Sequence, residues 1–122
     1  MLWSKTRLLV AAISLFSTVV YAEKITCPEV LKDGGKIYRM NMVSVFEGEP
    51  EKRVDLMPDT DDNMVWTLKP SQENVKAQHT AMYLVCRYKG TDKTTTLKIP
   101  ASAKKCTAWF GDNKNPFYAA CE

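Results

Sequence analysis

Apolar and polar residues alternate most clearly between residues 82 and 100, and this pattern predicts a β-hairpin. Every second side chain of residues 82–88 is apolar, as in a strand that buries one face. Lys89–Lys93 is a polar turn with one glycine, and the alternation resumes until Pro100, which lacks the N–H that a strand ladder needs. Met82, Leu84, Cys86 and Tyr88 share one face of the first arm, and Thr95, Leu97 and Ile99 share one face of the second. Of these residues, Leu84, Leu97 and Ile99 are predicted to enter the core.

A second long strand is predicted over residues 37–46. A regular alternation places Tyr38, Met40, Met42, Ser44 and Phe46 on one face, and Ile37, Arg39, Asn41, Val43 and Val45 on the other. Both faces carry apolar residues, so this strand is predicted to be central in its sheet.

The remaining segments are short and are separated by Gly, Pro, Asn and Asp. We predict strands over 52–57, 64–68 and 106–110, an extended entry over 24–28, a helical turn at 29–33, another within 70–78, and a closing segment over 117–121. Many short strands with turn signals between them indicate a mainly β fold, a small antiparallel β-sandwich or barrel. The predicted core comprises Met40, Met42, Val45, Phe46, Val54, Leu56, Trp66, Leu68, Leu84, Leu97, Ile99, Trp109 and Phe117.

The first 22 residues have the composition of a secretory signal peptide. Lys5 and Arg7 precede an apolar run from Leu8 to Val20, and the small residue Ala22 ends the segment. The run is too short for a spanning helix, and no cysteine follows Ala22 as a lipid attachment point. We therefore expect residues 1–22 to be removed, leaving one domain over 23–122 in the periplasm, with the extracellular space as the alternative, and no membrane anchor.

The net charge that remains after removal of the signal peptide gives little information about the partner. Loss of the two basic residues of the signal lowers the formal net charge of the 122-residue chain from +3 to +1. A value near zero does not suggest a nucleic acid or a membrane surface as the partner.

Four cysteines in a short exported chain indicate two disulfides. Three pairings are open, and we favour Cys86–Cys106, which would clasp the hairpin, with Cys27–Cys121, which would tie the termini together. The alternative, a zinc site, usually has two ligands within a C-x₂₋₄-C spacing, and no such pair occurs.

No constellation for catalysis or cofactor binding stands out. His79 is the only histidine, is expected half exposed at the start of a strand, and lacks a nucleophile such as a G-x-S-x-G serine. Residues 59–63 open like a calcium loop, but Met64 and Pro70 stand where that loop needs Gly and Glu, so an acidic turn is the preferred interpretation. We predict that the protein is not an enzyme, and we predict no metal or other cofactor.

Three segments together resemble a family of small exported proteins of Gram-negative bacteria. They are Ile25-Thr-Cys-Pro28, Leu84-Val-Cys-Arg-Tyr-Lys-Gly-Thr91, and Leu97-Lys-Ile-Pro100 leading to Cys106. Some members of that family are encoded near type VI secretion genes. The resemblance implies a periplasmic immunity protein that blocks a toxin directed at the cell wall.

A looser resemblance is to the periplasmic lysozyme inhibitors. These small disulfide-bonded β-barrels share the export signal, the size and a strand end similar to Cys86-Arg-Tyr-Lys-Gly90. Their Ser-Gly-x-x-Tyr inhibitory motif is absent from this sequence. Lysozyme inhibition is therefore the alternative function, and an exported β domain with another role is a further one.

Both resemblances imply a binding protein whose partner is a periplasmic enzyme or toxin. Loops held on a disulfide frame lose little conformational freedom on docking, which favours them as contact sites. The candidate contact residues are Tyr88, Lys89, Asp92 and Lys93 at the predicted hairpin tip, and Trp109, Asp112 and Lys114 in the late loop.

Overall fold

The computed structural model describes residues 24–59, 64–112 and 116–122, and the predicted signal peptide lies outside these ranges. The described chain is mainly β, with one short α-helix and one 3₁₀ turn. The elements are β1 (Ile25–Thr26), β2 (Val30–Asp33), β3 (Lys36–Glu47), η1 (Pro50–Lys52), β4 (Asp55–Leu56), β5 (Met64–Thr67), α2 (Lys69–Ala77), β6 (Met82–Tyr88), β7 (Thr94–Ile99), β8 (Lys105–Trp109) and β9 (Tyr118–Cys121). No helix in the described ranges is long and apolar enough to cross a membrane.

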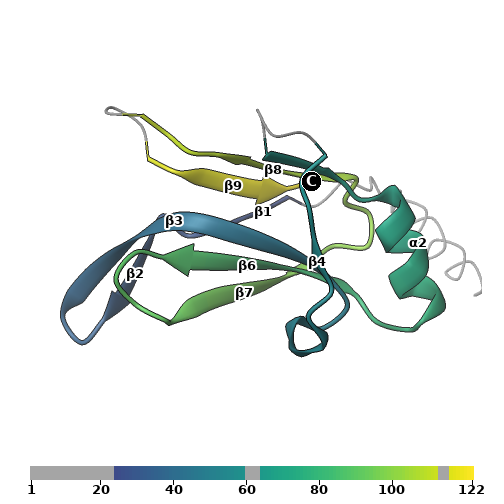
Figure 1. Ribbon diagram of the computed structural model, residues 1–122, viewed down its shortest axis with the longest axis horizontal. Helices are drawn as coiled ribbons and strands as arrows, with labels where there is room; N and C mark the ends of the chain where they lie inside the picture. The colour runs from purple at the N-terminus through teal and green to yellow at the C-terminus, as the bar shows by residue number, and fades with distance from the viewer. Residues whose placement is uncertain (1–23, 60–63, 113–115) are drawn as a thin grey trace, which may run out of the picture.

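The strands form two antiparallel sheets that pack against each other, with α2 at one end (Figure 1). One sheet has the order β1-β9-β8-β5, and the other has the order β2-β3-β6-β7 with β4 also paired to β3. Buried residues of both sheets form one apolar cluster, to which Trp66 and Leu84 contribute from opposite sides. The predicted antiparallel fold with two disulfides is confirmed.

The β6–β7 hairpin forms as its alternation predicts. Met82, Leu84, Cys86 and Tyr88 are all buried, and the register pairs Leu84 with Leu97. On β7, Ile99 is buried and Leu97 packs partly against the core. Period-two patterning works here because the pairing of the two strands is uninterrupted.

A β-bulge changes the face assignment on β3. Met40 lies opposite Tyr88 whereas Met42 lies opposite Arg87, so β3 holds one extra residue at this point. The extra residue exchanges the faces, and Val43 becomes buried while Met42 is 41% exposed. The regular alternation predicted for 37–46, and the core position predicted for Met42, are therefore wrong.

The segment predicted as a helical turn at 29–33 is instead strand β2. It pairs with β3, with Asp33 opposite Lys36. Gly34 and Gly35 between them have φ of +59° and +80°, the two positive values that a two-residue type I′ hairpin turn requires. The glycines that seemed to end a helix make a hairpin.

Helix α2 is longer than the single turn predicted within 70–78. It buries Ser71 and Val75, and the Gln72 side-chain amide donates to the carbonyl oxygens of Pro100 (2.9 Å) and Ala103 (3.1 Å). These contacts fix a polar nine-residue helix that would be marginal in isolation.

Two further core predictions are wrong, because Val54 and Trp109 are each 45% exposed. Val54 precedes the two-residue strand β4, and Trp109 lies at the end of β8 on the face opposite to buried Ala108. The other predicted core residues are buried or pack partly against the core or its sheets.

The disulfides join Cys27 to Cys86 and Cys106 to Cys121, so the favoured pairing was wrong. Cys106 on β8 lies directly opposite Cys121 on β9, with 3.9 Å between their Cα atoms. Lys105 and Glu122 exchange both backbone hydrogen bonds, which makes the cysteines the adjacent, closer non-hydrogen-bonded pair.

Cys86 belongs to the other sheet, where Cys27 reaches it at a Cα separation of 5.9 Å. Cys27 follows β1, and its N–H still donates to Ala119 of β9 at 2.9 Å. The Cys27–Cys86 bridge therefore joins the two sheets, whereas Cys106–Cys121 staples two neighbouring strands of one sheet.

Removal of the bridge between the sheets is expected to cost more stability than removal of the bridge within one sheet. The loops closed are 59 and 15 residues long, and chain entropy gives about 4 and about 3 kcal/mol respectively. Denaturant unfolding of C27A/C86A and C106A/C121A, each compared with the parent, measures the two losses. Equal losses, or the reverse order, would contradict this account.

Candidate functional site

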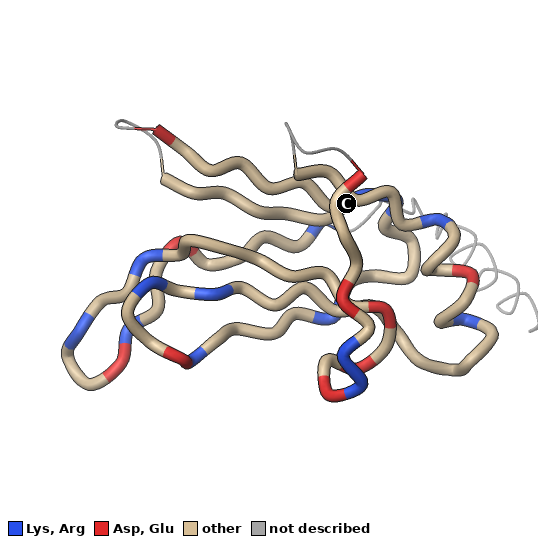
Figure 2. Tube along the Cα trace, in the orientation of Figure 1, with Lys and Arg blue, Asp and Glu red and all other residues tan. Residues whose placement is uncertain are grey.

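Basic residues gather at the end of the chain trace far from α2 (Figure 2). They come from the β2–β3 and β6–β7 hairpins, which lie next to each other because β3 pairs with β6. We call this region the basic hairpin end and define it by Lys32, Lys36, Arg39, Arg87, Lys89 and Lys93.

Two contacts hold the two hairpin tips together. The Lys93 Nζ atom lies 2.7 Å from Asp33 Oδ2, and the Lys89 N–H donates to the Arg39 carbonyl oxygen at 2.9 Å. Gly90 lies near the Tyr38 ring, since a Cβ added to it would come to 3.6 Å from a ring carbon. The tips therefore form one surface although they are far apart in sequence.

The hydrogen bond to Asp33 raises the pKa of the Lys93 ammonium above its ordinary value of 10.5. A raised lysine pKa favours the charged form in the folded protein, so the contribution of this contact is present below pH 10.5 and fades above it. The pair is consequently intact at neutral pH, where it joins the two tips.

The structure separates the four residues predicted at the hairpin tip. Lys89, Asp92 and Lys93 are exposed, but Tyr88 is only 3% exposed and cannot present its ring to a partner. The Tyr88 hydroxyl donates to the Pro28 carbonyl oxygen at 3.0 Å, with the Thr95 hydroxyl 3.2 Å away. Tyr88 thus holds the base of the β6–β7 hairpin to the segment that contains Pro28.

Two of the late-loop residues, Trp109 and Asp112, belong to the other sheet, at the end of β8 and just after it, at the same end of the sandwich (Figure 1). Trp109 is 45% exposed and faces Tyr118 across the strands, while Asp112 is exposed and Lys114 lies outside the described residues. Lys24 Nζ lies 5.8 Å from the centre of the Tyr118 ring. An aromatic surface therefore accompanies the basic one.

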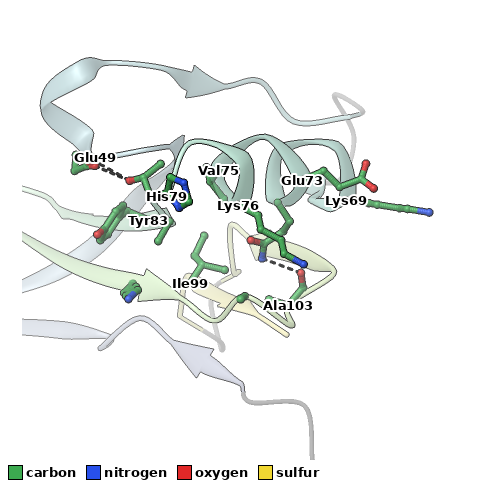
Figure 3. Close-up of a pocket in the computed structure, with 14 residues that line it drawn as sticks. Glu49, Lys69, Glu73, Val75, Lys76, His79, Tyr83, Ile99 and Ala103 are labelled. Atoms are coloured by element: carbon green, nitrogen blue, oxygen red, sulfur yellow. Dashed lines mark hydrogen bonds between the residues drawn. The ribbon is translucent and has the colours of Figure 1, made fainter.

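A large hollow lies at the opposite end, between α2 and the adjoining ends of β6 and β7 (Figure 3). Its volume is about 860 Å³, and Val75, Ile99 and Ala103 supply apolar lining. Its charged lining is of mixed sign, with three lysines and two glutamates: Lys69, Lys76, Lys98, Glu49 and Glu73.

The charged state of the Glu49 carboxylate in this hollow is explained by a hydrogen bond. The Thr80 hydroxyl donates to the carboxylate, at 2.6 Å from one oxygen and 3.0 Å from the other. This bond is the main cause that lowers the pKa of Glu49 below its ordinary value of 4.5. A carboxylate held in its charged form by a hydroxyl is a poor general acid at neutral pH.

His79 lies at the edge of the same hollow, after the helix and not at a strand start, and it is exposed rather than half exposed. Its φ is +58°, and its N–H and that of Thr80 donate to the carbonyl oxygens of Lys76 (3.2 Å) and Val75 (2.9 Å). This is a Schellman cap with histidine at the position that glycine usually takes.

The described residues offer no metal site. No group of three or more His, Cys, Asp or Glu side chains in the described ranges could hold an ion. All four cysteines form disulfides, which excludes zinc coordination by cysteine. Residues 60–63 of the acidic turn lie outside the description.

Comparison with known families decides the identity. Residues 34–122 match the model of the Type VI secretion system Tli immunity protein family. The chain belongs to this family. The match covers most of the chain and includes the β6–β7 tip, the hollow and three of the four cysteines, but it begins after strand β2 and so leaves out Lys32 and Asp33. Neither a curated protein nor a solved structure gave a match.

Membership of the Tli immunity family confirms the resemblance to type VI immunity proteins and implies a toxin as the partner. It does not select the residues that bind. The contact residues proposed from the sequence stay predictions, apart from the buried ring of Tyr88.

Sequence reasoning missed the contribution of the β2–β3 tip to the charged end of this Tli family member. Lys32 was passed over because residues 29–33 were assigned to a helical turn, and without the β2–β3 hairpin Lys36 and Arg39 were not placed at a tip. The available signal was the pair Gly34-Gly35 between two stretches of chain with apolar residues, which is typical of a tight hairpin.

Glycine at position 79 is expected to stabilise the protein by about 0.5–1 kcal/mol. A left-handed residue other than glycine costs about 1–2 kcal/mol, and the greater freedom of glycine in the unfolded chain cancels part of that gain. Denaturant unfolding of H79G measures the change. H79A is the control and should show no gain, because alanine keeps the left-handed penalty; equal effects of the two variants would contradict the cap assignment.

Proposed function

We propose that this protein neutralises its cognate type VI toxin by binding it directly in the periplasm. The observation that carries the proposal is the match of residues 34–122 to the Tli immunity protein family. The composition of the first 22 residues supports export, and two disulfides suit an oxidising compartment.

Inhibition by binding, rather than by chemistry, fits the surfaces described above. The large hollow is lined by Val75, Ile99 and paired or solvated charges, and its one histidine caps a helix. The charged and aromatic surfaces, in contrast, are carried on tied hairpins. Such preorganised surfaces lose little entropy when a partner docks.

The toxin's target is a finer part of the same proposal. The resemblance seen in the sequence implies a toxin that attacks the cell wall, and this target stays a prediction. Degradation of peptidoglycan in intoxicated cells, abolished by the immunity protein, is the expected result; an intact wall in dying cells would redirect the proposal to another envelope target.

Co-expression tests the proposal. A type VI toxin identified from the genes adjoining this one is exported to the periplasm of a host cell, with the full chain, with a chain lacking residues 1–22, or with neither. We expect growth only with the full chain, because the shortened chain stays in the cytoplasm. Equal protection by both chains would contradict the periplasmic site, and protection by neither would contradict immunity itself.

Purified protein provides the matching binding measurement. The mature domain is titrated into a catalytically inactive form of that toxin, and a complex with defined stoichiometry is expected. Lysis of cells by lysozyme in the presence of the domain is the parallel assay. Inhibition of lysozyme without toxin binding would support the alternative function instead.

A further inference from the structure

We infer that the basic hairpin end is the toxin-docking surface and that it fits a face of the toxin rich in carboxylates. The inference rests on the proposed function and adds to it the surface and the chemistry of the partner. The proposed surface consists of the six basic residues defined above and the apolar residue Ile37.

Charge is the first argument. This end carries six basic residues and three acidic ones, Glu29, Asp33 and Asp92. One of the acidic residues, Asp33, already forms an ion pair with Lys93. Within the described residues, Lys32, Lys36, Arg39 and Lys89 form no ion pair. Such unpaired charges favour a complementary negative surface and would speed its approach.

An exposed apolar residue lies within this charge. Ile37 is 62% exposed, pairs across the hairpin with Lys32, and shares its face of β3 with Arg39. An apolar contact surrounded by basic side chains is the arrangement of a protein interface, with an apolar centre and a charged rim.

Rigidity is the third argument. The Lys93–Asp33 ion pair and the Lys89–Arg39 backbone hydrogen bond tie the two tips together. Beneath them, Cys86 holds β6 to the other sheet, and the Tyr88 hydroxyl binds Pro28. A surface fixed in this way is prepared for docking before the partner arrives.

A protein fits this surface better than an anionic membrane does. Two exposed acidic residues, Glu29 directly before β2 and Asp92 in the β6–β7 turn, belong to the same end and would disfavour phosphate groups. On a protein partner, basic groups could match these positions individually. Lipid binding is therefore an outcome of the test and not part of the inference.

The test reverses one lysine on each tip. K36E/K89E is expected to raise the Kd for the inactive neighbouring toxin about 100-fold, because close like charges replace attraction by repulsion. Binding of the parent should weaken as ionic strength rises, and that salt dependence should be smaller in the variant. Equal unfolding midpoints of the two proteins confirm that the variant is folded.

K69E/K76E on α2 is the matched control. It changes the net charge by the same amount at exposed positions beside the hollow, and its Kd should change less than about threefold. I37A provides an independent variant, which should weaken binding about tenfold with the salt dependence unchanged. Equal losses from the two double variants would assign the effect to overall charge and overturn the inference.

The remaining outcomes separate the inference from the proposed function. Parent protein that binds the toxin, with K36E/K89E and I37A binding equally well, would overturn the docking surface alone. Parent protein that does not bind would overturn both. Flotation with vesicles of phosphatidylethanolamine and phosphatidylglycerol gives the last arm: vesicle binding lost in K36E/K89E, with toxin affinity unchanged, would assign the surface to lipid and overturn the inference.

Discussion

The covalent bond between Cys27 and Cys86 joins the two sheets of this protein. β6, which carries Cys86, pairs with both β3 and β7, whereas Cys27 directly follows the short edge strand β1 of the opposite sheet. The bond therefore fixes the centre of one sheet to an edge of the other. A chain of this size has a small core, and cross-links supply a large share of its stability.

The same bond bears on function because it lies close to the charged end. Tyr88 follows Cys86 by two residues, and its hydroxyl binds the carbonyl of Pro28, which follows Cys27. One covalent contact and one hydrogen bond thus hold the base of the β6–β7 hairpin, and the ion pair to Asp33 holds its tip. This arrangement places a fixed pattern of charge on a stable frame, which suits the binding function proposed for this Tli family member.

The alternation of apolar and polar residues predicted the strands whose pairing is regular. The alternation of residues 82–99 gave the β6–β7 hairpin with its buried face, because nothing interrupts that pairing. It failed on β3, where one extra residue exchanges the faces, and at residues 29–33, where pairing with β3 overrides a weak helical pattern. Both errors arise from contacts with a neighbouring strand that spacing alone does not reveal.

The same limit applied to the cysteines and to the candidate site. Cys106 meets Cys121 because β8 and β9 are adjacent, and that adjacency is a property of the fold. Lys89, Asp92 and Lys93 were correctly expected to be exposed, whereas Tyr88 continues the buried face of its strand and could have been assigned to the core. The hollow beside α2 could not be foreseen, since it joins the helix to strand ends distant in sequence.

The central claim is that one disulfide joins the sheets, and peptide mapping under non-reducing conditions tests it directly. Protein purified from the periplasm is digested with its thiols blocked, and the cross-linked peptides are identified by mass. The account predicts peptides that join Cys27 to Cys86 and Cys106 to Cys121. A peptide joining Cys86 to Cys106, or four free thiols, would contradict it.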